Sequence, residues 1–278
     1  MMNQIRAEFL KLKYSNVLKI VLGLFGLGFL LYVVFGISDG GTQVFVSEGD
    51  EEINPMIHGM IGFLAFTFDN AAFPHFNEIM ESAMSCNVFL WVFMLIFVVY
   101  FFNYDYHVGT IKLPVAYGIS RSRIFAAKVI VIITYFGVLY MLFSVITLLY
   151  TCIKVNYFPN VREVLLYFEY TMLNYMVMMT FTMICILTSI CLKNAGIIAT
   201  IMCLFTLVGA IIYTGIWQQF HSLSLLQYIV RLTPLYYWMN MGTLRLEYGI
   251  IREVIIYFCF GIILLPISVV LINKQELK

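Results

Sequence analysis

Long apolar runs with few or no charges alternate with short polar stretches along this chain. A helix needs about 20 apolar residues to cross the hydrocarbon core of a bilayer. Runs of about this length cover residues 17–37, 86–102, 129–153, 170–192, 195–217 and 254–273, and only the first carries a charge, Lys19. Because backbone groups in lipid must be satisfied within the segment, runs this continuous predict helices rather than barrel strands. We therefore expect an all-α polytopic membrane protein with six transmembrane helices in a single domain that covers residues 1–278.

Composition agrees with this pattern. Hydrophobic residues make up 62% of the chain and charged residues 11%, and the mean hydropathy is +0.93, outside the range of soluble domains. The net charge of +1 gives no reason to expect a nucleic-acid partner. The first apolar run has full span length and no small-residue cleavage site, so we expect it to stay in the membrane rather than act as a signal peptide.

The distribution of basic residues predicts the orientation. The stretch 103–128 carries four basic residues against one acid, whereas 38–85 carries eight acids and no Lys or Arg. The positive-inside rule then places 103–128 and both termini in the cytoplasm, and 38–85 outside as a large acidic loop. Residues 53–68 are also uncharged but short, and a crossing there would move the basic loop outside. We expect 53–68 to form an outer-surface or partly re-entrant helix.

The N-terminal segment, residues 1–16, has its own periodicity. Ile5, Phe9 and Leu12 are spaced at i, i+4 and i+7, and Lys11 and Lys13 lie mostly away from that stripe. This spacing predicts a short amphipathic helix in the cytoplasmic membrane interface. The alternative is a positively charged flank that only sets the topology.

The acidic outer loop offers a candidate surface. Its densest patch consists of Glu48, Asp50, Glu51 and Glu52. Such a patch can attract cationic substrates or partners, although the depletion of Lys and Arg in outer loops accounts for it as well. Cys86 and Cys152 both fall near outer helix ends. Their pairing stays open, because geometry excludes most disulfides proposed from sequence alone.

Catalytic patterns are missing from the sequence. It contains no G-x-x-x-x-G-K-[ST], no HExxH and no G-x-S-x-G, so we expect no catalytic, cofactor or metal site and no enzymatic activity in this chain. Charges lie mostly at span ends, whereas proton or sodium carriers place ionisable groups within the membrane. We expect the energy for any transport to come from another subunit.

The basic loop carries a recognisable series of residues. An acid after the second apolar run is followed by a Gly-Thr-Ile-Lys turn and by a Ser-Arg-Ser-Arg run that leads into the third. In order and sidedness this series resembles the ABC-2 type permeases, the six-helix membrane subunits of ATP-binding-cassette exporters. The candidate ATPase-coupling residues are Asp105, Gly109, Thr110, Ile111, Lys112, Ser120, Arg121 and Arg123.

The resemblance implies a mechanism and partners. The N-terminal segment would be the family's interfacial elbow, and a short coupling helix within 103–128 would dock on a separate ATPase. Arg121 and Arg123 would pair with acids of the ATPase or with lipid phosphates, unless they are topology signals alone. Two ATPase subunits would supply ATP and Mg²⁺, and a second permease copy or a related permease would complete the pathway.

The same resemblance points to a function. Chains of this size resemble permeases of peptide-antibiotic and lantibiotic immunity systems in the bacterial cytoplasmic membrane. We expect export of a hydrophobic or amphipathic substrate, first of all an antimicrobial peptide. The alternative is a non-transporting membrane sensor or assembly protein that recruits a soluble partner through loop 103–128.

Overall fold

The computed structural model describes residues 2–35, 76–84, 87–108, 112–192, 194–211, 232–234, 236–237 and 248–274. Within these residues all regular secondary structure is helical. The helices are α1 (Met2–Tyr14), α2 (Asn16–Phe35), α3 (Phe76–Met84), α4 (Asn87–Val108), α5 (Lys112–Ala116), α6 (Arg121–Val155), α7 (Val161–Leu192), α8 (Ala195–Ile211) and α11 (Tyr248–Lys274). The segment 53–68, Cys86 and the acidic patch at 48–52 lie outside the described residues.

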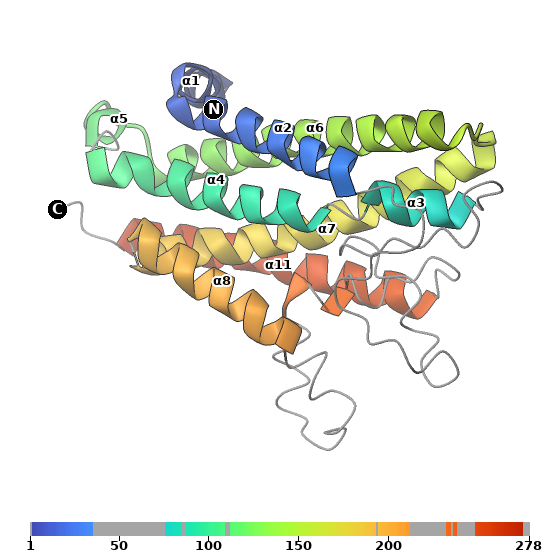
Figure 1. Ribbon diagram of the computed structural model, residues 1–278. Coiled ribbons are helices and arrows are strands. Elements are labelled where there is room, and N and C mark those ends of the chain that lie inside the picture. Colours follow the sequence, from blue (N-terminus) through green and yellow to red (C-terminus); the bar gives the residue numbers. More distant parts are fainter. Residues whose placement is uncertain are drawn as a thin grey trace.

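The longer helices run alongside one another and form a bundle with two distinct ends (Figure 1). One end, which we call the α5 end, holds α5, the last turns of α4, α7 and α11, and the first turns of α6 and α8. The opposite end, which we call the α3 end, holds α3 and the turn between α6 and α7. Successive long helices therefore alternate in direction, as the predicted topology requires.

Four helices in the described part of the chain are long and apolar enough to cross a membrane. They lie at Asn16–Val34, Arg121–Val155, Val161–Leu192 and Ile251–Lys274. Helices α4 and α8 contain shorter apolar stretches, Leu90–Asn103 and Ala195–Phe205, at the places of the second and fifth predicted spans. The length and apolar character of these helices support a multi-pass membrane protein whose described elements are all helical.

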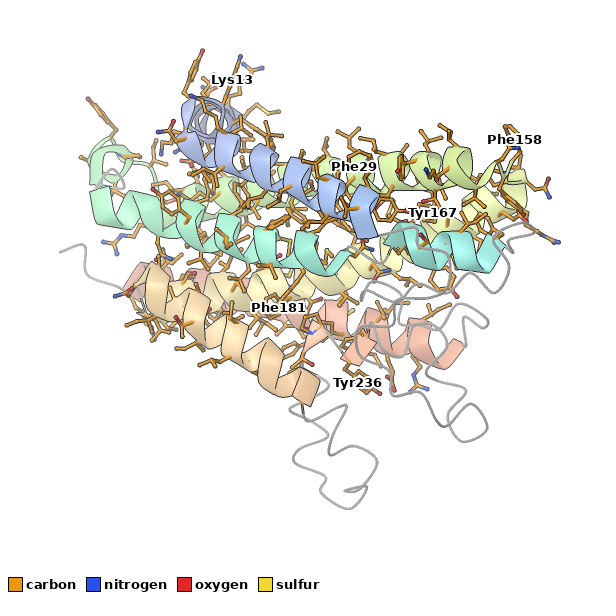
Figure 2. All side chains as sticks on the ribbon, in the orientation of Figure 1. Lys13, Phe29, Phe158, Tyr167, Phe181 and Tyr236 are labelled. Atoms are coloured by element: carbon orange, nitrogen blue, oxygen red, sulfur yellow. The ribbon has the colours of Figure 1, made fainter. Side chains whose placement is uncertain are left out.

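Helix α7 forms the centre of the bundle. In its most apolar stretch 61% of the residues are buried, against 28–39% in the other three candidate spans. It packs against α4, α8 and, most extensively, α11. Figure 2 shows Phe181 of α7 inside the bundle, where its ring lies 5.2 Å from that of Trp91 of α4. Because of this central position, α7 contacts helices on several of its sides.

Helix α3 lies within the acidic segment predicted as an outer loop, and it packs against part of α6. Its apolar side chains follow a helical stripe and are fully or almost fully buried, namely Phe76, Ile79, Met80, Ala83 and Met84. Burial of this stripe favours the helix, since an amphipathic helix this short is not stable alone in water. The C-terminal part of the predicted outer loop, which forms α3, is therefore packed against the bundle.

Hydroxyl groups join the helices near the α3 end. The Tyr32 hydroxyl of α2 hydrogen-bonds the hydroxyls of Thr151 in α6 and, at 3.3 Å, Ser82 in α3. The Tyr167 hydroxyl of α7, labelled in Figure 2, donates to the Ser144 carbonyl oxygen of α6 at 2.8 Å. Buried hydroxyls need partners, and here each partner belongs to a different helix, so these bonds fix the relative placement of the helices.

The turn between α6 and α7 is closed by local hydrogen bonds. Asn156 adopts a left-handed conformation (φ 57°), and the Tyr157 amide donates to the Cys152 carbonyl oxygen at 2.9 Å. The Asn160 amide donates to the Glu163 carboxylate at 2.7 Å, which satisfies a free donor at the start of α7.

Burial, together with the bonded Glu163 carboxylate, raises the pKa of Tyr157. Cys152 is a buried free thiol, and Phe158 marks the exposed tip in Figure 2.

Gly137 of α6 permits a close approach by Tyr175 of α7. A Cβ atom at Gly137 would lie 2.7 Å from the Tyr175 hydroxyl, which donates to the Ile133 carbonyl oxygen at 2.8 Å. We expect Gly137→Ala to displace the phenol and lower the unfolding free energy by about 1–3 kcal/mol, measured as a lower melting temperature in detergent. Gly26→Ala is the control, since no described atom lies within 4 Å of its Cβ position. Equal melting temperatures for the two variants would contradict this account.

Candidate functional site

A short helix stands between the second and third apolar helices, at the α5 end (Figure 1). Helix α5 spans Lys112–Ala116, inside the loop where sequence analysis expects a short helix. Pro114 fits its first turn, where a backbone amide would have no helical acceptor. The Gly118 amide donates to the Val115 carbonyl oxygen at 3.0 Å, and the Ile119 amide to that of Pro114 at 3.1 Å. These two bonds form a Schellman motif that ends α5.

Gly118 is required for this ending, because its φ of 79° lies in the left-handed region that side chains disfavour. The turn leaves Tyr117 at the C-cap position with 80% of its surface exposed. A large aromatic side chain held on a rigid turn is a typical anchor for a protein partner. Tyr117 was not among the predicted site residues, although the sequence places it directly before a glycine, as the one aromatic residue between positions 109 and 120.

The start of α6 follows two residues later. Ser120 is extended (φ −64°, ψ 142°), and its carbonyl oxygen accepts the amides of Arg123 and Ile124 at 3.0 and 3.3 Å. The Ser120 side chain makes no cap bond to the helix and instead accepts a bond from the Ser122 hydroxyl at 3.4 Å. Ser120 therefore caps the start of α6 with its backbone carbonyl oxygen and not with its side chain.

The basic residues of the loop divide into two groups. Arg121 donates from Nη1 to the Ile272 carbonyl oxygen of α11 at 3.3 Å, and Lys128 donates from Nζ to the Phe101 carbonyl oxygen of α4 at 3.3 Å. Arg123, in contrast, is exposed. Arg121 and Lys128, two of the four basic residues of the loop, thus contact neighbouring helices. Arg123 stays available to a partner or to lipid phosphates.

Lys128 is 2% exposed, which is unusual for a lysine. Its ammonium group lies 5.0 Å from the ring centre of Phe101 and 5.6 Å from that of Phe102. The aromatic faces and the carbonyl oxygen are all electronegative, so together they replace water around the charge. Lys128 consequently fixes the start of α6 against the last turns of α4.

The remaining coupling candidates are described only in part. Asp105 lies in the last turn of α4 and Lys112 begins α5, but their side chains are outside the described residues. Gly109, Thr110 and Ile111 lie outside them altogether. Their coupling roles stay predictions.

The N-terminal helix α1 packs against α6 with the predicted stripe. Leu12 is buried, and Ile5 and Phe9 are partly buried against the core. Lys13 points away from the bundle (Figure 2). Lys11 bonds the Glu8 carboxylate at 2.9 Å.

Glu8 is fully buried, a position that the predicted stripe did not include. Its second carboxylate oxygen has no hydrogen-bond partner within the described part of the chain. The spacing indicates this position, because Glu8 lies three residues after Ile5 and four before Leu12 and so shares their face of the helix. Helix α1 is thus docked through a stripe that is not purely apolar.

These elements define a multi-pass membrane protein that presents a short helix with an exposed aromatic residue at one end of its bundle. A family model for the ABC-2 family transporter protein matches residues 4–214, from α1 through α8. The chain belongs to this family of ABC transporter permeases. No curated protein matches the sequence.

Proposed function

We propose that this chain is the membrane-spanning permease subunit of an ABC exporter, with six spans and with the α5 end in the cytoplasm. The observation that carries the proposal is the placement of α5 and Tyr117. In a member of the ABC-2 family, the element between the second and third apolar helices is suited to receive force from an ATPase. The charge pattern supports the orientation, since the basic loop belongs to the α5 end.

The complete transporter is proposed to contain two copies of a separate ATPase, which bind ATP and Mg²⁺, and a second permease copy or a related permease. The substrate is proposed to be hydrophobic or amphipathic, with an antimicrobial peptide as the first choice. That choice rests on the resemblance to peptide-antibiotic immunity permeases and on the acidic patch at 48–52, which would attract a cationic peptide. The bacterial cytoplasmic membrane is the proposed location.

Affinity purification in mild detergent from the native host tests the proposal. The expected result is a co-purifying P-loop ATPase with vanadate-sensitive turnover, identified by mass spectrometry. Recovery of the chain without any ATPase, under conditions that keep known transporter complexes intact, would reject the permease function. A different soluble protein bound through loop 103–128 would instead support a non-transporting sensor or assembly role.

Tyr117 provides a sharper test of the docking surface. Because it is 80% exposed at the end of α5, we expect Tyr117→Ala to reduce the recovered ATPase by about tenfold. The melting temperature of the permease should not change, since the side chain has few contacts within the chain. Tyr14→Ala is the matched control, because Tyr14 is 78% exposed on α1, outside the loop. Equal ATPase recovery with both variants would exclude Tyr117 as an anchor.

A further inference from the structure

The contact between Arg121 and Ile272 joins two helix ends that are 151 residues apart. Arg121 is the first residue of α6, immediately after the α5 turn, and Ile272 lies in the last turn of α11. Carbonyl groups in the last turn of a helix lack helical partners and carry the negative end of the helix dipole. A guanidinium donor there makes a charge-assisted hydrogen bond, which is stronger than a neutral one. The start of α6 is thus attached directly to the end of α11.

Helix α11 is in turn packed closely on the central helix α7. At Gly261 a Cβ atom would lie 3.1 Å from the Thr180 Cα and 3.0 Å from the Met183 Sδ, so α11 approaches the α7 backbone closely at this glycine. The Tyr257 hydroxyl also donates to the Leu232 carbonyl oxygen at 2.8 Å, and its ring stacks on Tyr237 at 4.4 Å. The end of α11 thus belongs to a helix that is packed along α7 over its earlier turns.

One face of α6 carries both of its inward cations. Arg121 and Lys128 are separated by seven residues, and between them Ile124 and Phe125 are buried at the same helical spacing. Lys128 holds this face to α4, and Arg121 holds it to α11. Arg123 is exposed. The first turns of α6 thus contact α4 and α11 through the face that carries Arg121 and Lys128, and Arg123 lies outside that face.

We infer that Arg121 is a positioning residue that transmits movement of the α5–α6 segment to α11, rather than a residue that binds the ATPase. This inference rests on the proposed function, because it takes the ATPase as the source of the movement. Docking and transmission are then separate tasks of neighbouring arginines: Arg123 serves docking, and Arg121 serves transmission. Helix α11 lies beyond the residues matched by the family model, so the family match does not supply this link.

The two tasks separate experimentally in the complex of permease and co-purified ATPase, reconstituted in lipid nanodiscs. Hydrogen–deuterium exchange of the peptide that contains the last turns of α11 is measured with and without ATP and vanadate. In the natural protein we expect a nucleotide-dependent change in this peptide. In Arg121→Gln we expect normal recovery of ATPase, loss of that change, and about tenfold faster exchange at the end of α11. Arg121→Lys, which keeps the charge and a donor, should restore part of the nucleotide response.

Arg123→Gln is the matched control, since it removes the same charge two residues away at an exposed site. We expect less ATPase to be recovered with this variant, but a normal nucleotide response in the complexes that remain. A full nucleotide response in Arg121→Gln would overturn the inference, as would loss of ATPase from Arg121→Gln together with full recovery from Arg123→Gln. If no ATPase is recovered with the natural protein, the proposed function fails and the inference fails with it. An ATPase that binds and turns over without any effect on α11 would refute the inference alone.

Discussion

Replacing Gly261 with leucine is expected to separate α11 from α7 and to prevent recovery of a stable protein. A Cβ atom at this position already lies 3.1 Å from the backbone of Thr180 and 3.0 Å from the Met183 sulfur. A flexible side chain can move away from such an intrusion, but the Thr180 backbone belongs to the central helix and cannot. Overpacking costs about 1–3 kcal/mol even where side chains can adjust, so a leucine here should cost about 3 kcal/mol or more.

The measurement is size-exclusion chromatography in detergent followed by thermal unfolding. We expect Gly261→Leu to aggregate or to melt far below the natural protein, and Gly261→Ala to fall between them. Gly26→Leu supplies the control for adding an apolar side chain to a membrane helix, because no described atom lies within 4 Å of its Cβ position. A Gly261→Leu protein that elutes normally and melts within about 2 °C of the natural one would show that α7 and α11 are not in close contact.

The long apolar helices were predictable from the sequence, but their ends were not. The predicted spans 129–153 and 170–192 lie in α6 and α7, which begin at Arg121 and Val161. The prediction counted only uncharged residues, whereas helical hydrogen bonds join backbone groups and continue through charged positions. In α6 the charge at Lys128 is accommodated by a carbonyl oxygen and two aromatic rings of α4, which sequence periodicity does not reveal.

Helix α3 was missed for a different reason. The acidic charge of the segment predicts an outer loop, whereas the periodicity of its apolar residues indicates a helix. Phe76, Ile79, Met80, Ala83 and Met84 repeat at helical spacing, and Glu78 and Glu81 fall between them. A loop that is depleted of basic residues by the positive-inside bias can still form an amphipathic helix, because the two patterns place independent demands on the sequence.

The short helix in the basic loop was predictable as a region, but the contacts of the basic residues around it were not. Its position between two apolar runs and its basic charge located the loop, and the short helix α5 is present there. The different environments of Arg121 and Arg123 could not be predicted from the sequence, because the Arg121 partner lies 151 residues away at the end of α11. The hydroxyl contact between Tyr32 and Thr151 was hidden for the same reason, since its members come from sequence-distant helices.

Reversing the charge of Lys128 is expected to be the most damaging change at the α5 end. A carboxylate introduced by Lys128→Glu would face the Phe101 carbonyl oxygen and the electronegative faces of Phe101 and Phe102. These three contacts, which now stabilise the ammonium group, would become repulsive at a position that is 2% exposed. An unpaired buried charge costs about 3–5 kcal/mol, which is a large part of the stability of a folded domain. We expect little folded protein in the membrane fraction, measured by fluorescence-detected size-exclusion chromatography.

Two controls separate this local effect from a change in topology. Arg123→Glu reverses a charge in the same loop at an exposed site, so it alters the positive-inside signal equally and should leave the melting temperature unchanged. Lys128→Met keeps most of the aliphatic stem but loses the hydrogen bond and the cation–π contacts, for an expected loss of about 1–3 kcal/mol. If Lys128→Glu and Arg123→Glu behave alike, the loop charge acts through topology alone, and Lys128 does not hold α6 against α4. If only Lys128→Glu fails, the attachment of α6 to α4 is a condition for the bundle to form.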